Sequence, residues 1–377
     1  MAPSSGRVPE PESRKTVGIN KETVSNTVST DFPDNYPDGD ESWDKDWFAQ
    51  NLKIEFHQND DYEAQFSLIG VDASIANAFR RILIAEIPTL AVETVFIQNN
   101  TSVVQDEVLS HRLGLIPFTG GKEGIRDWMK WWHKPVEGAD QYSTTYDHNT
   151  VQLKLQVECT HNKDAAPDEK DPTKLYHNAH VYAKDIVYEP AGAQEQYFSG
   201  DNIIRPTNPD ILIAKMRPGQ VIDLEMHMHK GIGADHSKFS PVATASYRLM
   251  PVIKILKPIL GDDAKKFQEC FMPGTIKLEK VTKQHVKANK EYAGHEGEVM
   301  AAVDNPLYDT VSREVLRHPE FEGKVKLGRK RDHFIFSIES TGQWESDELF
   351  LESIKTLKTK SQKLQTQVQN MVYTYSG

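Results

Sequence analysis

The chain has 377 residues, 38% hydrophobic and 26% charged, which is enough to bury the core of one large domain or two ordinary ones. Its net charge of −11 argues against autonomous nucleic-acid binding, because proteins that hold DNA or RNA unaided usually present a basic face. With only two cysteines, Cys159 and Cys270, disulfide scaffolds and cysteine-rich zinc sites are excluded.

Neither a signal peptide nor a membrane span is apparent in the sequence. Residues 1–15 are polar, and no apolar run follows them. No window reaches the roughly 18 uninterrupted apolar residues that a membrane span requires. We therefore expect the chain in a reducing compartment, the cytosol or the nucleus, with no membrane partner.

The first segment, residues 1–46, is rich in Pro, Ser, Thr and Asp and poor in aliphatic residues. Such a stretch buries too little surface to offset the entropy that ordering costs, so we predict a disordered tail. Its aromatic residues Phe32, Tyr36 and Trp43 are candidates for docking on a partner.

A β-hairpin is predicted next. Leu52, Ile54 and Phe56 alternate with polar residues, and a second apolar run follows at 66–69. The Asn-Asp-Asp sequence at 59–61 is typical of a turn, so the two runs are expected to pair through it.

The clearest helix of the first third follows the hairpin. Asp72 or Ser74 can cap its start, and Pro88 stops it. Apolar residues at spacings of three and four form one face of it: Ile75, Phe79, Ile82 and Leu83. Arg80 and Arg81 fall towards the other face.

A strand is predicted at 90–98, and a shorter helix at 105–113 with Gly114 as the residue after its end. This helix carries two acids in its first turn and two bases in its last: Asp106, Glu107, His111 and Arg112. That order suits the helix dipole and i,i+4 ion pairs. Nothing in the sequence indicates the cleft and shifted pKa that a catalytic role for these groups needs.

Between residues 118 and 240 the composition of the sequence changes. Proline, glycine and histidine are scattered among short strand-like runs, at 151–157, 181–187, 211–215 and 221–228. We predict a separate, β-rich region set into the chain. Beyond it the pattern predicts a strand, a helix and another strand, at 275–281, 310–317 and 333–339.

The last helix is the most regular predicted element. Residues 347–371 contain no glycine or proline, and apolar residues step by four and three along a heptad seam with one polar member. The seam consists of Phe350, Ile354, Leu357, Ser361, Leu364, Val368 and Met371. A seven-turn stripe needs a partner surface of its own length. We favour another chain, and the alternative is the sheet of its own domain.

One pair of histidines is a candidate metal site. His227 and His229 alternate on a predicted strand, so both rings would face one side, with His236 or Cys159 as a third ligand. A pair of surface histidines on a half-exposed strand is the favoured alternative, because no third ligand has a usual spacing. The sequence contains no phosphate-binding loop or nucleophile elbow, and we expect no cofactor.

Two other clusters have a functional and a structural interpretation. The dense basic cluster consists of Lys324, Lys326, Arg329, Lys330 and Arg331. It suits RNA contact or nuclear import, but a solvated loop that faces an acidic partner is favoured. For Trp128, Trp131 and Trp132, packing into the β-rich region or onto a partner is favoured over base stacking.

Several segments resemble the alpha-like subunits of cellular RNA polymerases. The match to the alpha motif covers 72–117, with the core N-A-F-R-R-I-L at 77–83 and the second half D-E-V-L-S-H-R-L-G-L-I-P at 106–117. The sequence K-F-S-P-V-A-T-A at 238–245 resembles the return from the family's insert domain. Three segments resemble the larger alpha-like subunits common to RNA polymerases I and III: 29–33, 177–183 and 243–249.

The resemblance implies an α+β fold. A discontinuous dimerisation domain of sheet and long helices would occupy 47–117 and 241–377, with the β-rich insert at 118–240. The RNA polymerase II member of the family has a four-cysteine zinc loop in its insert, which cannot form here because only Cys159 lies in that region. The iron–sulfur insert of archaeal relatives is excluded by the same count.

The resemblance also implies a function without catalysis. The chain would pair with a smaller alpha-like subunit and form the platform for the second-largest subunit in RNA polymerases I and III, and so support transcription of rRNA, tRNA and 5S RNA. A location in the nucleus, including the nucleolus, follows. Little or no direct nucleic-acid contact is expected.

On this hypothesis two sets of residues carry the function. The dimer interface and its supporting core would contain Ile75, Phe79, Ile82, Leu83, Phe350, Ile354, Leu357, Leu364 and Val368. The contact with a large subunit would contain Arg80, Arg81, Asp106, Glu107, His111 and Arg112. The rival hypotheses are a stand-alone homodimeric scaffold and a metal-dependent hydrolase that uses His227 and His229.

Overall fold

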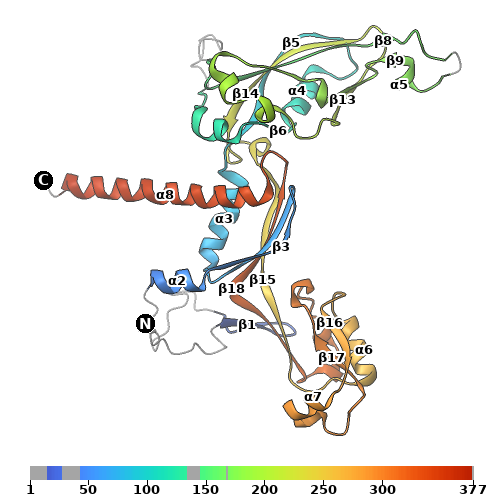
Figure 1. Cartoon of the computed structure of the whole chain (residues 1–377), viewed down its shortest axis with the longest axis vertical. Helices are drawn as coiled ribbons and strands as arrows, with labels where there is room; N and C mark the ends of the chain where they lie inside the picture. The colour runs from blue at the N-terminus through green and yellow to red at the C-terminus, as the bar shows by residue number, and fades with distance from the viewer. Residues whose placement is uncertain (1–14, 28–42, 134–144, 167–168, 376–377) are drawn as a thin grey trace. The chain divides into compact units, whose positions relative to one another are not determined.

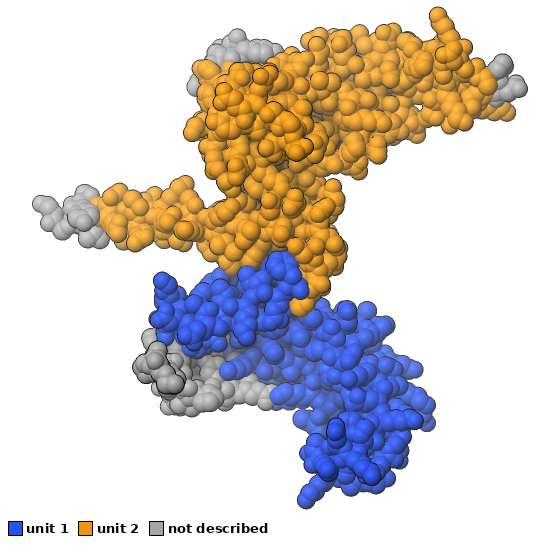
Figure 2. Space-filling view, in the orientation of Figure 1, with its two compact units in different colours: residues 1–56, 66–76, 247–336 blue, residues 57–65, 77–246, 337–377 orange. Residues whose placement is uncertain are grey.

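The computed structural model describes residues 15–27, 43–133, 145–166 and 169–375 (Figure 1). Contacts divide the described chain into two compact units (Figure 2). Unit 1 comprises residues within 1–56, 66–76 and 247–336, and unit 2 comprises residues within 57–65, 77–246 and 337–377.

The largest sheet has six strands in the order β2-β1-β18-β4-β3, with β15 also paired to β18. The strands are β1 (Thr16–Ile19), β2 (Val24–Ser25), β3 (Lys53–Asn59), β4 (Glu63–Ile69), β15 (Val242–Ile255) and β18 (Val325–Ser340). In unit 1, Phe66 stacks on Phe336 at 5.4 Å between ring centroids, and Tyr247 lies 5.3 Å from the same ring. Strands β3 and β4 are neighbours, so the predicted hairpin is confirmed.

Strand β1 corrects the expectation of a wholly disordered tail. It pairs antiparallel with β18, from Thr16 opposite Lys330 to Ile19 opposite Leu327, and Ile19 is only 5% exposed. The expectation of disorder is therefore wrong for residues 15–27. The same pairing places the basic cluster of 324–331 largely in a strand, not in the solvated loop that we expected.

The end of the predicted tail contains the start of a helix and one of the three candidate docking aromatics. Helix α2 (Lys45–Asn51) begins where Asp44 accepts hydrogen bonds from the backbone N–H groups of Asp46 and Trp47. Trp43 is 74% exposed, with its ring 6.4 Å from that of Phe48. The other candidate docking residues, Phe32 and Tyr36, lie outside the described residues.

The remainder of unit 1 contains a second, smaller core. It is built from α6 (Gly261–Glu269), β16 (Ile276–Lys280), α7 (Lys283–Ala288), β17 (Val299–Val303) and the 3-10 turns η7 (Lys290–Tyr292), η8 (Pro306–Tyr308), η9 (Glu314–Arg317) and η10 (Pro319–Phe321). Phe267 is central to it, with Phe271 and Phe321 at 5.0 and 5.4 Å. The helix predicted at 310–317 is wrong. Val311 has a φ of +62°, which a helix does not tolerate, so only η9 forms.

Unit 2 contains a four-stranded sheet in the order β11-β7-β14-β5. Its strands are β5 (Thr89–Asn100), β7 (Val151–Glu158), β11 (Val187–Glu189) and β14 (Val221–Gly231). β14 pairs antiparallel with both β5 and β7 along most of its length. β5, which precedes the predicted insert, therefore shares a sheet with strands from 118–240.

Short elements complete this part of unit 2. The helices are α4 (Asp106–Gly114), α5 (Pro172–Leu175) and the short π-helix η1 (Gly124–Trp128). The 3-10 turns are η3 (Ala183–Asp185), η4 (Gly192–Gln196), η5 (Gly200–Asn202) and η6 (Ser237–Phe239). The strand pairs are β6 (Phe118–Thr119) with β12 (Arg205–Pro206), β8 (Thr160–His161) with β9 (Tyr176–His177) and β10 (His180–Tyr182) with β13 (Leu212–Lys215). The strand predicted at 181–187 is broken by η3. Gly114 is the last helical residue of α4 and not the residue after it.

Two helices complete the fold, α3 (Ala73–Ala85) and α8 (Ser346–Tyr375). Asp72 caps α3 by accepting a hydrogen bond from the backbone N–H of Ser74 at 2.8 Å, as predicted. α8 has 30 residues, and Figure 2 shows its last turns projecting from the rest of unit 2. Within the described chain, no helix is long and apolar enough to cross a membrane.

Candidate subunit interface

The predicted heptad seam of α8 divides into a buried base and an exposed stripe. Phe350 is 3% exposed, and burial continues only as far as Ser353, which is 0% exposed. Beyond it, Leu357 is half-buried and the other apolar members are open to solvent. Their exposed fractions are 37% for Ile354, 61% for Leu364, 51% for Val368 and 62% for Met371. An exposed apolar stripe of this length on a helix is typical of an interaction surface.

The predicted interface residues of α3 mostly lie in the core of the chain itself. Phe79, Ile82 and Leu83 are at most 9% exposed, while Ile75 is half-buried. The ring of Phe79 meets that of Phe350 edge-on at 5.2 Å, so α3 supports the base of α8. In the chain alone, Phe79, Ile82 and Leu83 therefore belong to the supporting core, and Ile75 is left partly open.

A second contact joins α8 to Glu86, the residue that follows α3. The ammonium of Lys360 lies 2.7 Å from one carboxylate oxygen of Glu86 and 2.8 Å from the other. Both side chains are partly open to water, so the pair contributes at most about 1 kcal/mol to stability.

The predicted large-subunit residues are partly engaged within the chain. Arg80 donates to Asn77 Oδ1 at 3.1 and 2.9 Å, whereas Arg81 is exposed. In α4, Asp106 accepts from Asn100 at 2.6 Å and Arg112 donates to the carbonyl of Leu212 at 2.6 Å. Glu107 and His111 of α4 are exposed in the chain alone.

Sequence reasoning missed an apolar element of the α4 surface. Val103, Val108 and Leu115 are 82%, 48% and 49% exposed. Val108 and Leu115 are seven residues apart, so they lie on one side of the helical turn, away from the buried Leu109 and Leu113. This seven-residue spacing was the signal available in the sequence.

The two histidines of the metal hypothesis point to different partners. His227 Nε2 lies 2.9 Å from Glu225 Oε1, while the His229 ring stacks on Trp132 at 4.3 Å and its Nδ1 lies 3.1 Å from the Asn149 carbonyl. Both are 4% exposed, so the alternative of surface histidines is wrong. Burial lowers the pKa of His229. Among the described residues, no group of three or more His, Cys, Asp or Glu side chains could hold a metal ion.

The tryptophan cluster packs mainly within unit 2. Trp128 stacks on Tyr197 with centroids 4.6 Å apart, and Trp132 covers His229. Trp131 is 47% exposed and lies under the ammonium of Lys230, which is 5.2 Å from the ring centroid. Two of the three rings therefore have the packing role that we favoured.

The family is shown by sequence comparison over most of the chain. The model described as the RNA polymerase Rpb3/Rpb11 dimerisation domain matches residues 65–361. The chain belongs to the alpha-like family of RNA polymerase subunits. The resemblance identified from the alpha motif is thereby confirmed.

Individual alpha-like relatives cover nearly the whole chain. The DNA-directed RNA polymerases I and III subunit RPAC1 of Saccharomyces cerevisiae is 46% identical over 348 residues, which is 92% of this chain and 97% of the yeast protein. Its human namesake is 45% identical over 349 residues, 93% of this chain and 94% of the human protein. Subunit 3 of RNA polymerases II, IV and V from Arabidopsis thaliana is 31% identical over 317 residues, 82% of this chain and 88% of the plant protein.

The structure places the alpha motif of this alpha-like subunit on two helices and the strand between them. Its core sequence at 77–83 lies in α3, and its second half at 106–117 contains α4. Among the three relatives, the two named for polymerases I and III are the more similar to this chain. The matched region ends at residue 361, so the more distal part of the exposed stripe lies beyond it.

Proposed function

We propose that this chain is a non-catalytic assembly subunit of nuclear RNA polymerases I and III. It pairs with a smaller alpha-like subunit, and the pair forms a platform for the second-largest subunit. The polymerases it serves transcribe rRNA, tRNA and 5S RNA, so its location is the nucleus, including the nucleolus. The sequence identity of 45–46% to subunits named for polymerases I and III supports this assignment.

The exposed stripe on α8 carries the pairing part of the proposal. Five apolar seam residues after Phe350 are half-buried or exposed in the chain alone: Ile354, Leu357, Leu364, Val368 and Met371. An apolar side chain contributes about 1.5–3 kcal/mol when it is fully buried, so covering this stripe is strongly favourable. Because the family is defined by a dimerisation domain, we expect another alpha-like chain to cover the exposed stripe.

The platform part of the proposal rests on α4 and the outer face of α3. Val108 and Leu115 give α4 an apolar patch, and Glu107 and His111 lie beside it as polar groups. The exposed Arg81 supplies a planar cation that binds carboxylates and carbonyls in pairs. Such a mixture of apolar and charged groups is usual at interfaces between subunits.

Co-expression with the smaller alpha-like subunit of the same organism tests the proposal. Native mass measurement of the purified complex is expected to give one copy of each chain. A stable homodimer of this chain that ignores the smaller subunit would contradict the proposal and favour the stand-alone scaffold. Zinc in stoichiometric amount that is lost on His229→Ala would favour the hydrolase instead.

A further inference from the structure

We infer that an ion-pair latch, formed by Lys122 and Arg126 with Glu348 and Glu352, sets the direction in which α8 projects from the rest of unit 2 and so positions its exposed stripe for pairing. The inference rests on the proposed function for the pairing step. The latch residues themselves need not touch the partner; they are positioning residues.

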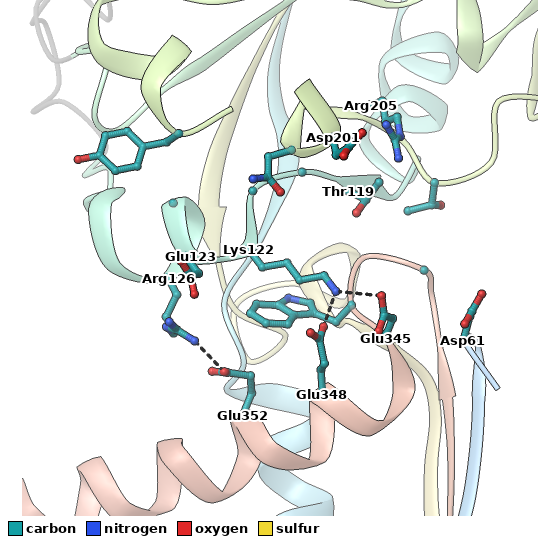
Figure 3. Close-up of a pocket in the computed structure, with 18 of the residues that line it drawn as sticks. Asp61, Thr119, Lys122, Glu123, Arg126, Asp201, Arg205, Glu345, Glu348 and Glu352 are labelled. Atoms are coloured by element: carbon teal, nitrogen blue, oxygen red, sulfur yellow. Dashed lines mark hydrogen bonds and ion pairs between the residues drawn. The ribbon is translucent and has the colours of Figure 1, made fainter. Parts of the chain in front are cut away.

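The geometry of the latch is complementary along two helical turns. Arg126 Nη1 lies 2.8 Å from Glu352 Oε1, and Lys122 Nζ is hydrogen-bonded to Glu348 and lies 3.6 Å from Glu345 (Figure 3). Lys122 and Arg126 are four residues apart, and so are Glu348 and Glu352. The two cations therefore lie about one helical turn apart, and so do the two carboxylates that they meet. The latch lies at one side of a cleft of about 790 Å³ in unit 2.

Burial makes the Arg126–Glu352 pair the firm point of the latch. The Glu352 side chain is 9% exposed and that of Arg126 30%, so water screens this pair less than a surface ion pair. The guanidinium is fixed from its other side by Asp127, at 2.8 Å, and both carboxylates raise the pKa of Arg126. A planar guanidinium held by two carboxylates has little freedom to rotate.

The turn that carries Arg126 is itself held in place. The ammonium of Lys230 in β14 donates to the backbone carbonyl of Arg126 at 2.8 Å and to that of Met129 at 3.2 Å. Lys230 is 8% exposed, and its burial lowers its pKa to about 8. The central strand of the sheet thus fixes η1, and η1 fixes the base of α8.

The latch and the apolar core hold opposite sides of α8. Glu348 and Glu352 lie two residues before and after Phe350, which places them roughly 200° around the helix from it. Phe350 packs on Phe79 of α3, whereas the two carboxylates meet Lys122 and Arg126. A helix that is held by contacts on one side alone can change the angle of its axis. A second set of contacts on the opposite side restricts this change.

The length of the free helix makes this angle important. From Ile354 to Met371 the helix extends over roughly 25 Å at 1.5 Å per residue. A swing of about 10° at the base would move the far end by roughly 4–5 Å, close to one helical turn of about 5.4 Å. A displacement of that size would take Leu364 and Val368 out of register with a partner surface.

The first test measures the helix direction in the full chain alone. Spin labels at Lys215→Cys in β13 and Lys363→Cys in α8 report the distance between two points of unit 2. We expect Arg126→Glu to widen the distance distribution by several ångström, and the charge swap Arg126→Glu with Glu352→Arg to narrow it again. Lys130→Glu, an equal charge change at an exposed neighbour, is the control and leaves the distribution unchanged. An unchanged distribution in Arg126→Glu overturns the latch.

The second test measures the dissociation constant for the smaller alpha-like subunit, below the melting temperature of every variant. Arg126→Glu is expected to weaken binding about tenfold, and the charge swap to recover most of that loss. If Arg126→Glu widens the distance distribution but binds the smaller subunit with wild-type affinity, the latch has a structural role and no role in pairing. That result overturns the inference. If the wild-type chain fails to bind while the distribution widens, the proposed function fails and the latch stands.

Discussion

Replacing Leu364 and Val368 together by glutamate tests whether α8 is the pairing surface. Both side chains are more than half exposed in the chain alone, so the substitution removes little packing within the fold. Glutamate also favours helices, so the free energy of unfolding is expected to change by less than about 0.5 kcal/mol. A loss of pairing would then report on the interface itself.

The expected loss of binding follows from the exposed fractions. Leu364 has 61% and Val368 51% of its surface left to bury, and full burial of such side chains contributes about 1.5–3 kcal/mol each. Their share in pairing is therefore about 2 kcal/mol, or roughly 30-fold in the dissociation constant. Two carboxylates placed without partners in an apolar interface raise the loss to about 4 kcal/mol, or roughly 1,000-fold.

The assay is a titration of the smaller alpha-like subunit with each purified variant. Gln362→Glu with Thr366→Glu is the matched control, since these positions have the same spacing on the same helix but lie off the seam. The control is expected to bind within about threefold of wild type. Equal affinities for wild type and the Leu364/Val368 variant would refute the reasoning, as would equal losses in the variant and the control.

Three further predictions concern the fold. Phe79→Ala is expected to lower the free energy of unfolding by about 3–5 kcal/mol, because it leaves a cavity against Phe350. Urea unfolding measures this loss, and a loss below about 1 kcal/mol would contradict the packing of the two rings. Ile19→Asp is expected to destabilise unit 1 and to speed hydrogen exchange of the amides at 327–330, since it places a charge at a buried position of β1; unchanged exchange would mean that β1 does not pair. Burial lowers the pKa of His229 below its ordinary value of 6.5, so the folded state favours the neutral ring. The contribution of this preference to the free energy of unfolding is present above pH 6.5 and is lost as the pH falls through the lowered pKa. Urea unfolding between pH 7 and pH 5 is therefore expected to show a larger loss of stability for wild type than for His229→Gln, and parallel losses would contradict it.

The helices were the most predictable part of the fold. α3 follows from an Asp72 cap, a spacing of three and four and a proline stop, which are all local signals. The same is true of α8, whose course follows from a heptad pattern with one polar member and from the absence of glycine and proline. The pattern does not say where burial ends along a helix, and that boundary after Ser353 depends on which other elements reach it.

The errors occurred where structure depends on distant segments. β1 has few apolar residues of its own and is ordered by pairing with β18, more than 300 residues away. The basic cluster was assigned to a loop because its charges hide a strand that is paired along its backbone. Val311 stops a predicted helix through a left-handed φ that valine rarely adopts and no pattern indicates.

The candidate site was predictable in its apolar part and not in its ionic part. The stripe residues follow from spacing alone. The latch depends on Arg126 and Glu352, which are 226 residues apart, and no local pattern connects them. Similarly, the histidines at 227 and 229 share a strand in sequence, but neighbours from other strands determine what each ring contacts.

Affinity purification of the tagged chain from nuclei shows directly whether the chain assembles with polymerase subunits through α8. We expect the smaller alpha-like subunit and the second-largest subunits of RNA polymerases I and III to be recovered with the wild-type chain. We expect all of them to be lost with the Leu364/Val368 double glutamate variant. Recovery of the chain alone or as a homodimer, or of the same subunits with both chains, would contradict assembly through α8.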